Sequence, residues 1–478
     1  MKHFAQILLF MAMVAAPFGM TGAQSMTDTV RLSYEDYLGI VLENHPVAKQ
    51  AEIRGLSGKQ YLRTARGAFD PYLSANWDSK QFSGKNYWQV FESSLRVPTW
   101  FGTELFTGWN SANGTYLNPG QSLPTAGQAV IGLEVNLGKG LLIDQRRADL
   151  QKAKIYAQAT LVDQRLMLLD LIIDATNAYW NWWLAYRNQL TFLEALKLAK
   201  VRHEAVVASE IRGENPAIDT LEAYLQVQNR YMNLSEAEVE VTKTSRGLSN
   251  FLWNPAGEPV EFEKPIIPAD SLPLVSMPNL TDELVDSLVT AHPDLLYYQY
   301  QQAQLEIEER WRREQLKPEV AFKYQALSAA PAGDALLGAF IPSSNLKWGI
   351  KFSFPLFLRK QRGYLELTRL SLRELDYQQS RKRLEIINKI AAMMVQIQQI
   401  QAQIQLATEI VANYLAMVTA ENQKFGMGES SVFLVNSREQ KLIDGELKLN
   451  ELQSKLPKVI GEANRITGGY LLPLEDQE

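Results

Sequence analysis

The chain has 478 residues, of which 46% are hydrophobic and 21% are charged, and its formal net charge is −5. This composition is typical of a folded protein with room for about two ordinary domains. The 48 Lys and Arg residues are scattered, so no nucleic-acid partner is indicated. There is no cysteine, which excludes disulfides, thiol nucleophiles, zinc-thiolate sites and a lipidated N-terminal cysteine.

The first 25 residues predict a secretory signal peptide. A short basic start precedes an apolar segment at residues 7–16 and a small-x-small cleavage site at residues 23–25. The alternative, a membrane anchor, would need about 20 apolar residues, and this segment is too short. We therefore expect residues 1–25 to be removed from an exported protein.

The rest of the chain is a tandem duplication. The segment YEDYLGIVLENHPVAKQ (34–50) matches TDELVDSLVTAHPDLLY (281–297) at a constant offset, so that His45-Pro46 falls on His292-Pro293. A proline-rich polar segment between the copies is typical of an extended connector. These features predict five parts, namely a signal peptide (1–25), a first repeat (26–253), a connector (254–279), a second repeat (280–470) and a C-terminal tail (471–478).

Each repeat begins with short amphipathic helices, after which the apolar period changes from helical spacing to two. The segments PYLSANW (71–77), IGLEVNL (131–137) and KWGIKFSF (347–354) alternate apolar and polar residues. Such strands have one apolar and one polar face, as in half-buried sheets or transmembrane barrels. Residues 78–128 exceed their counterpart in the second repeat and predict either an added hairpin or a long extracellular loop.

After the strands, each repeat enters a very long helix. The two helices are predicted at about residues 141–212 and 362–425, or about 105 and 95 Å at 1.5 Å per residue. Apolar residues from Ile390 to Val418 follow a heptad, and residues from Leu168 to Phe192 show a similar pattern. Sustained heptads predict coiled-coil packing, here against the helix that returns after a glycine turn.

Two architectures fit these elements. Long paired helices alone favour a periplasmic coiled-coil scaffold or adaptor without a pore. The amphipathic strands favour a membrane barrel, which must close because unpaired backbone groups are costly in lipid. Natural barrels have at least about eight strands, so an oligomer is required, and three copies with four strands each would supply about twelve.

At this point the chain resembles the TolC-like outer-membrane efflux proteins, over about residues 30–470. The resemblance depends on the duplicated order, on LENHP and TAHP, on ATNAYWNWWLAYRNQL, and on FGMGESSVFLVNSREQKLIDGELKLNEL. It implies a mostly α fold with β strands, in which a homotrimer forms a twelve-stranded outer-membrane barrel continued by a periplasmic α-helical barrel of coiled-coil hairpins.

The resemblance also implies a function. The protein would be the passive exit duct of a tripartite efflux or type I secretion system in a Gram-negative outer membrane. It would contact outer-membrane lipid and be docked by a periplasmic adaptor and an energised inner-membrane transporter. The sequence does not identify the cargo, whether drug, metal ion or polypeptide, or the class of pump.

The two turns are the predicted periplasmic tips. Gly213 and Gly428 match in the duplication and suit the positive φ of a helix C-terminus. Pro216 suits the first turn of the returning helix, and Ser430 or Ser431 could cap the other return. The adaptor-docking residues implied by the resemblance are Gly213, Glu214, Asn215, Pro216, Gly426, Gly428 and Glu429.

A constriction near the tips is a further expectation. Where related ducts carry acidic residues in the second hairpin, this chain has Leu434 and Ser437, but the first hairpin has Asp219 and Glu222. Three copies would form a carboxylate ring, a cation-selective arrangement. The alternative is an acidic first turn that only stabilises the helix dipole.

No catalytic pattern is present in the sequence. His45 and His292 lie at matching helix breaks, which favours structural roles over metal binding. A tryptophan cluster at residues 180–183 favours core packing over a substrate cage. No nucleophile–base pair, phosphate loop or metal-ligand spacing occurs. We therefore expect no enzyme activity, no cofactor and no metal.

Overall fold

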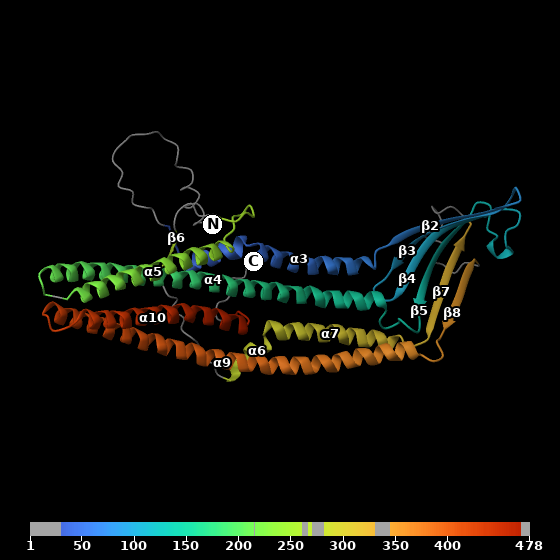
Figure 1. The fold of residues 1–478 in the computed structure, drawn as a ribbon. Coiled ribbons are helices and arrows are strands. Elements are labelled where there is room, and N and C mark those ends of the chain that lie inside the picture. Colours follow the sequence, from blue (N-terminus) through green and yellow to red (C-terminus); the bar gives the residue numbers. More distant parts are fainter. Residues whose placement is uncertain (1–29, 215, 261–265, 270–281, 330–344, 470–478) are drawn as a thin grey trace, which may run out of the picture.

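The computed structural model describes residues 30–214, 216–260, 266–269, 282–329 and 345–469. The predicted signal peptide, Asn215, much of the connector and the C-terminal tail lie outside the described residues. Long helices run side by side along most of the molecule, and a β-sheet stands at one end (Figure 1). Both helical turns lie at the opposite end, far from the sheet.

The first half of the chain follows the predicted order of short helices, strands and a long hairpin. Its elements are β1 (Val30–Leu32), α2 (Tyr34–Asn44), α3 (Pro46–Gly67), β2 (Tyr72–Phe82), β3 (Lys85–Pro98), β4 (Thr103–Asn113), the 3-10 turn η1 (Pro119–Gln121), β5 (Gln128–Asn136), α4 (Gln145–Ile211) and α5 (Ala217–Ser249).

The second half repeats this order with fewer strands. Its elements are β6 (Ile266–Pro268), α6 (Asp282–Thr290), α7 (Pro293–Glu314), β7 (Glu319–Ser328), β8 (Leu346–Ser353), α9 (Arg359–Gly426) and α10 (Val432–Ile466). The short strand β6 lies within the predicted connector and pairs in parallel with β1, which ties the connector to the start of the first repeat.

The two long helices are confirmed. Helix α4 has 67 residues and α9 has 68, which corresponds to about 100 Å each. The predicted heptad of α9 is its packing face, because Ile397 and Ile400 are buried against Val459 and Ile460 of α10. Toward the turns, each long helix therefore packs against the helix that returns after the turn, α9 against α10 and α4 against α5.

The helices form a row of four at every level of the molecule. Near the sheet the neighbours in contact are α3, α4, α7 and α9, and toward the turns they are α5, α4, α10 and α9. In Figure 1 the first-repeat helices lie above the second-repeat helices along the whole length. The chain thus builds a curved wall of helices rather than a compact bundle.

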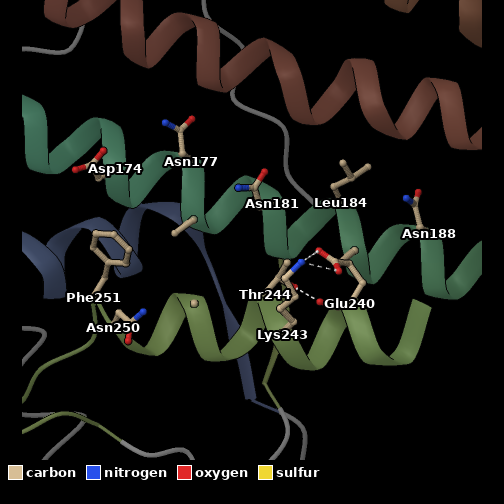
Figure 2. Close-up of a pocket in the computed structure, with 13 residues that line it drawn as sticks. Asp174, Asn177, Asn181, Leu184, Asn188, Glu240, Lys243, Thr244, Asn250 and Phe251 are labelled. Carbon is tan, nitrogen blue, oxygen red and sulfur yellow. Dashed lines mark hydrogen bonds and ion pairs between the residues drawn. The ribbon is translucent and has the colours of Figure 1, made fainter. Parts of the chain in front are cut away.

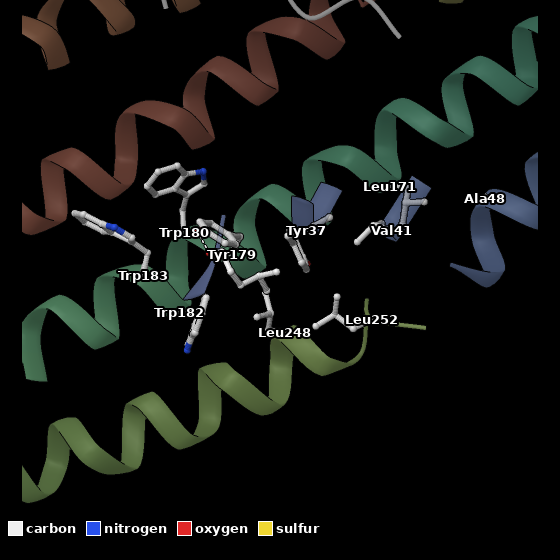
Figure 3. Packing of buried hydrophobic residues seen from close by; sticks show 12 residues of the cluster. Tyr37, Val41, Ala48, Leu171, Tyr179, Trp180, Trp182, Trp183, Leu248 and Leu252 are labelled. Carbon is white, nitrogen blue, oxygen red and sulfur yellow. Dashed lines mark hydrogen bonds between the residues drawn. The ribbon is translucent and has the colours of Figure 1, made fainter. Parts of the chain in front are cut away.

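An aromatic core holds α2 against the middle of α4 and the C-terminal end of α5 (Figure 3). Trp180 and Trp182 of α4 are almost fully buried, together with Tyr37 of α2 and Leu248 of α5. The hydroxyl of Tyr179 donates to the backbone oxygen of Leu32 at 2.9 Å, which anchors β1 to the same core. The tryptophan cluster therefore serves packing, as the sequence predicted.

The two matching histidines are helix caps. Nδ1 of His45 accepts from the backbone N–H of Val47 at 3.2 Å, and Nδ1 of His292 accepts from that of Asp294 at 3.0 Å. Each cap is followed by a proline at the first position of the helix, where a missing N–H costs nothing. The predicted structural role is confirmed for both.

The sheet has six strands in the order β2-β3-β4-β5-β7-β8, and each neighbouring pair is antiparallel. The open question about residues 78–128 is resolved, because β3 and β4 form an added hairpin within the sheet. The sheet of one chain therefore has six strands rather than four, and the twelve-stranded barrel stays a prediction. Small polar residues such as Ser93 and Ser111 interrupt the apolar face of this hairpin. The alternation of apolar and polar residues is therefore weak in the sequence.

Candidate functional site

The two turns at the far end have the same backbone geometry. The N–H of Gly213 donates to the oxygen of Glu210 at 2.8 Å, and that of Glu214 donates to Ser209 at 3.0 Å. In the second turn, Gly428 and Glu429 donate to the matching oxygens of α9 at 3.0 and 2.9 Å. Both turns are Schellman motifs, in which φ values of 76° and 78° require glycine.

The returning helices are capped differently from each other. Pro216, predicted in the first turn of the returning helix, is the N-cap of α5 and has extended φ and ψ. Its carbonyl accepts from the N–H of Asp219 at 3.0 Å, which closes the first turn of α5. Ser431 caps α10 by accepting from Leu434, while Ser430 donates to Glu421 at 2.6 Å.

Large apolar side chains surround both turns without cover. Ile211 is 82% exposed and Ile218 is 70% exposed in the first turn, and Met427 is 72% and Phe433 is 65% exposed in the second. Beneath them Val206, Ala223 and Val432 are buried and pack the two hairpins together. The two hairpins are therefore joined at the turn end, which carries apolar side chains on its outside.

The predicted constriction residues have different environments. Glu222 is half-buried, and its Oε1 lies 3.5 Å from Nδ2 of Asn436 on α10. Asp219 is also half-buried, and no side-chain partner is seen for it among the described residues, which exclude Asn215. Leu434 and Ser437 lie on the first turns of α10, with Leu434 42% exposed. Within one chain, therefore, the side chain of Glu222 faces the second hairpin, and Asp219, Leu434 and Ser437 lie near the turns.

Behind Glu222, a buried ion pair connects the two hairpins. Arg202 of α4 donates through both terminal nitrogens to the two carboxylate oxygens of Glu439 on α10. Arg202 also donates to Oδ1 of Asn436 at 3.0 Å. The Arg202 and Glu439 side chains are only 10% and 8% exposed, so this pair is shielded from solvent.

The register of the sheet sorts its side chains onto two faces, because directly paired residues in antiparallel strands point the same way. One row crosses all six strands as Leu73, Leu95, Thr107, Ile131, Ala326 and Leu346. This apolar face also carries Trp77, Phe91, Leu105, Trp109, Leu133, Val135, Val320, Phe322, Tyr324, Trp348, Ile350 and Phe352.

Much of the apolar face is uncovered. Leu73 and Phe352 are 77% and 68% exposed, and Trp77 and Trp348 are 65% and 62% exposed. A contiguous apolar surface of this kind marks a contact with a partner or with lipid. The strands that carry it have 8 to 14 residues, close to the roughly 9–11 that a tilted strand needs to cross a bilayer.

The opposite face is polar and charged. It carries Ser74, Asn76, Asp78, Glu92, Arg96, Glu104, Asn110, Glu134, Glu319, Lys323, Gln325, Lys347 and Lys351. Arg96 pairs with Glu104 at 2.8 Å, and Lys351 pairs with Glu319 at 2.7 Å. Phe106 also lies on this face, but Arg96 and Lys323 cover its ring at 5.5 and 5.0 Å.

Other kinds of site lack support in the part of the chain that the structure describes. Within these residues, no group of His, Asp and Glu side chains could hold a metal ion. Over the same ranges, no helix combines the length and apolar character that crossing a membrane requires.

Neither a known family model nor any curated protein matches the sequence, but solved structures match the fold along nearly its whole length. CusC has a TM-score of 0.66 at 14% identity, covering 94% of this chain and 95% of its own. The open state of the Neisseria gonorrhoeae MtrE outer-membrane channel has 0.65 at 15%, covering 96% of each. The Campylobacter jejuni CmeC outer-membrane channel has 0.62 at 14%, covering 97% and 95%.

The chain has the TolC-like outer-membrane channel fold. This confirms the resemblance that the sequence motifs indicated. At sequence identities of 14–15%, the similarity establishes the arrangement of helices and strands, that is, the fold. The TolC-like fold places the two hairpin turns and the sheet at opposite ends of a single chain (Figure 1).

One groove lies along the TolC-like helices, between α4 and α5 (Figure 2). Its walls include Asn177, Asn181 and Asn188 of α4 and the ion pair of Glu240 with Lys243 on α5, at 3.3 Å. Asn181 also accepts from Lys458 of α10 at 2.6 Å, and burial lowers the pKa of that lysine. Asn188 likewise accepts from Asn450 of α10 at 3.2 Å. Asn181 and Asn188 therefore serve contacts between helices, and the amides of this groove offer no nucleophile with a base beside it.

Sequence reasoning missed two features of the TolC-like tips. The pair of Arg202 and Glu439 joins residues 237 positions apart, which no local pattern reveals. The second is the set of exposed apolar residues at the turns, which helical periodicity alone does not distinguish from packing residues. A usable signal was present, because Ile211 and Met427 each lie within two residues of a turn glycine, where burial is not expected.

Proposed function

We propose that this protein is a passive channel of a Gram-negative outer membrane, working as a homotrimer without enzymatic activity. The sheets of three copies close into one barrel in the membrane, and the helices continue it as a tunnel through the periplasm. The observation that carries the proposal is the two-faced sheet, with its exposed apolar face backed by a charged face.

Closure follows from the physics of the bilayer. A sheet edge in lipid leaves N–H and C=O groups without partners, at several kcal/mol each. The apolar face would meet lipid, and the face with Arg96, Glu104 and Lys351 would line the water-filled lumen. A single six-stranded sheet falls below the roughly eight strands of the smallest natural barrels, so copies must combine.

The hairpin tips are the proposed docking surface for a periplasmic adaptor, which in turn recruits an energised inner-membrane transporter. Support comes from Ile211, Ile218, Met427 and Phe433, which remain exposed on a well-packed tip. Apolar side chains in such a position favour a protein partner. The turn residues Gly213, Glu214, Pro216, Gly426, Gly428 and Glu429 would shape the surface that the adaptor meets.

Docking is tested by placing charge on the tips. The double variant Ile211→Glu with Met427→Glu should no longer co-purify with a periplasmic adaptor protein, while the trimer still assembles. The adaptor is identified by sequencing the protein that co-purifies with the wild type. Thr242→Glu, at an exposed position toward the C-terminal end of α5 and far from the tips, is the control and should retain the adaptor. If the wild type, the double variant and the control recover the same amount of adaptor, the tips are not the docking surface.

A constriction at the tips is also proposed. Three copies of Asp219 and Glu222, with Leu434 and Ser437 opposite, would narrow the periplasmic end and favour cations. Support comes from their place on the first turns of α5 and α10, next to the turns.

A second candidate function is a periplasmic coiled-coil scaffold, which the buried heptads of α9 and α10 favour. Cell fractionation separates the two candidates. A channel should be found in the outer-membrane fraction and retain heat-resistant β structure after extraction in detergent. It should also conduct ions in planar bilayers. A mature protein that stays soluble in the periplasm and does not conduct would support the scaffold.

A further inference from the structure

We propose that all six strands of each copy enter the membrane barrel, so that the trimer has eighteen strands and a barrel as wide as its helical tunnel. This inference deepens the proposed channel function and depends on it. Its consequence is that the outer-membrane section does not select cargo by size or by charge. Selection would fall to the periplasmic tips.

The added hairpin β3–β4 is built as barrel wall. It is inserted between β2 and β5, and each of its strands pairs along its length with the neighbour on its outer side. Phe91 and Trp109 point to the apolar face, whereas Glu92 and Arg96 point to the polar face. A loop above the membrane would have no reason to keep this alternation in register with four other strands.

The widths of the two ends of the molecule support six strands rather than four. A row of four helices, spaced about 9 Å apart, spans about 36 Å per copy. Strands spaced about 4.8 Å apart and tilted about 40° each take about 6.3 Å of circumference, so six span about 38 Å. Four strands would span only about 25 Å by the same geometry and would narrow the duct at the membrane.

The two edges of the sheet suit closure with further copies. Strands β2 and β8 are exposed along their whole length, and no described residue pairs with their outer edges. Strand β2 leads away from the helices and β8 leads back toward them, so β8 of one copy meets β2 of the next as an antiparallel pair (Figure 1). Three times six strands then gives an even number, as antiparallel closure requires.

The polar face carries no ring of one sign. Arg96 and Lys351 are each paired with a carboxylate, at 2.8 and 2.7 Å. Lys323 pairs in register with Glu134 on the neighbouring strand. Selective pores are built from rings of like charge or from narrow passages, and this wall offers neither.

Single-cysteine labelling tests the inference, because the chain has no cysteine of its own. Cysteine is introduced at Phe91, Glu92, Trp109 and Asn110 in the added hairpin, and at Leu133 and Glu134 of β5 as the reference strand. The full-length protein in outer membranes is treated with a water-soluble maleimide. The polar-face positions should react several-fold faster than the apolar-face positions in all three strands, and the purified complex should have the mass of three chains.

The outcomes separate this inference from the channel itself. If the labelling rate alternates between the two faces of β5 but is the same on both faces of the added hairpin, the hairpin lies outside the barrel and the eighteen-stranded wall is wrong. If β5 also fails to alternate, the membrane channel itself is wrong. A complex of two chains would give twelve strands and would overturn the inference as well.

Discussion

Arg202 of α4 and Glu439 of α10 form a two-pronged ion pair that joins the first hairpin to the second. Asn436 extends this contact to Glu222, so that one buried polar network lies directly behind the tips. Because an unpaired buried charge is costly, the pair resists any separation of the hairpins at this level. The network therefore fixes how the tips stand relative to each other.

Breaking this pair from one side should be expensive. Glu439→Leu leaves Arg202 buried and unpaired, at a cost of about 3–5 kcal/mol in the stability of the tip region. The double variant Arg202→Leu with Glu439→Leu should cost much less than the two single variants together. Amide hydrogen exchange at the tips measures the local free energy of opening.

The pair of Lys448 and Glu451 on the same helix is the control. It lies at 2.7 Å, but its side chains are 59% and 53% exposed, so its removal should cost about 0–1 kcal/mol. Strictly additive costs in the Arg202 and Glu439 cycle would contradict a coupled pair.

The turn glycines should be sensitive to a single methyl group. Gly213→Ala and Gly428→Ala place a side chain at φ values of 76° and 78°, at a cost of about 1–2 kcal/mol each. Gly426→Ala is the matched control, because Gly426 ends α9 with helical geometry and open space around it. This third variant should be neutral or slightly stabilising. Amide hydrogen-exchange rates at the turns measure the stability of the three variants. Equal effects of all three would show that the positive φ does not require glycine.

The acidic residues of the first hairpin should set ion selectivity. Asp219→Ala with Glu222→Ala should weaken cation selectivity, and any block by multivalent cations, while the trimer still assembles. Glu236→Ala with Glu238→Ala removes the same charge from exposed positions farther along α5, and should leave selectivity unchanged.

If these carboxylates only stabilise the helix dipole, a different result follows. The Asp219 and Glu222 double variant would then lose a few tenths to about 1 kcal/mol of stability per residue. Its selectivity in planar bilayers would equal that of the unmodified channel, which would reject the ring.

The cap of α7 should make the protein sensitive to acid. Burial lowers the pKa of His292, and nearby Arg465 and Lys382 lower it further while Asp294 opposes them. The pKa of a histidine in the unfolded chain is about 6.5. The contribution of this cap to stability is therefore complete above that pH and is lost as the pH falls toward the lower pKa of the folded state.

His292→Asn should flatten this dependence, because asparagine retains a capping oxygen but does not titrate. The thermal midpoint of the detergent-solubilised protein, followed from neutral pH downward, gives the slope for each variant. His45→Asn is the companion variant, since burial also lowers the pKa of this more exposed cap, and its effect should be smaller. Parallel curves for wild type and His292→Asn would exclude the histidine as the source.

Local periodicity was enough to predict most of the fold. The heptad from Ile390 to Val418 located a packing face, and Gly213 and Gly428 located two turns, because each pattern has a local physical cause. The sequence alone does not decide between an added hairpin and a loop at residues 78–128, because Ser93 and Ser111 interrupt the apolar face of the hairpin. Arg202 and Glu439 could not be paired in advance, because the long hairpins bring them together only after both have folded.

The central claim is that three copies join β2 to β8 and close a barrel in the outer membrane. The most direct measurement combines Ala75→Cys in β2 with cysteine at Trp348, Ile350 or Phe352 in β8, oxidised in intact cells. We predict that at least one pairing gives covalent dimers and trimers in the outer-membrane fraction, and nothing larger, whereas no single-cysteine variant does. A protein that stays monomeric in every pairing, or that is recovered from the soluble periplasm, would contradict the account.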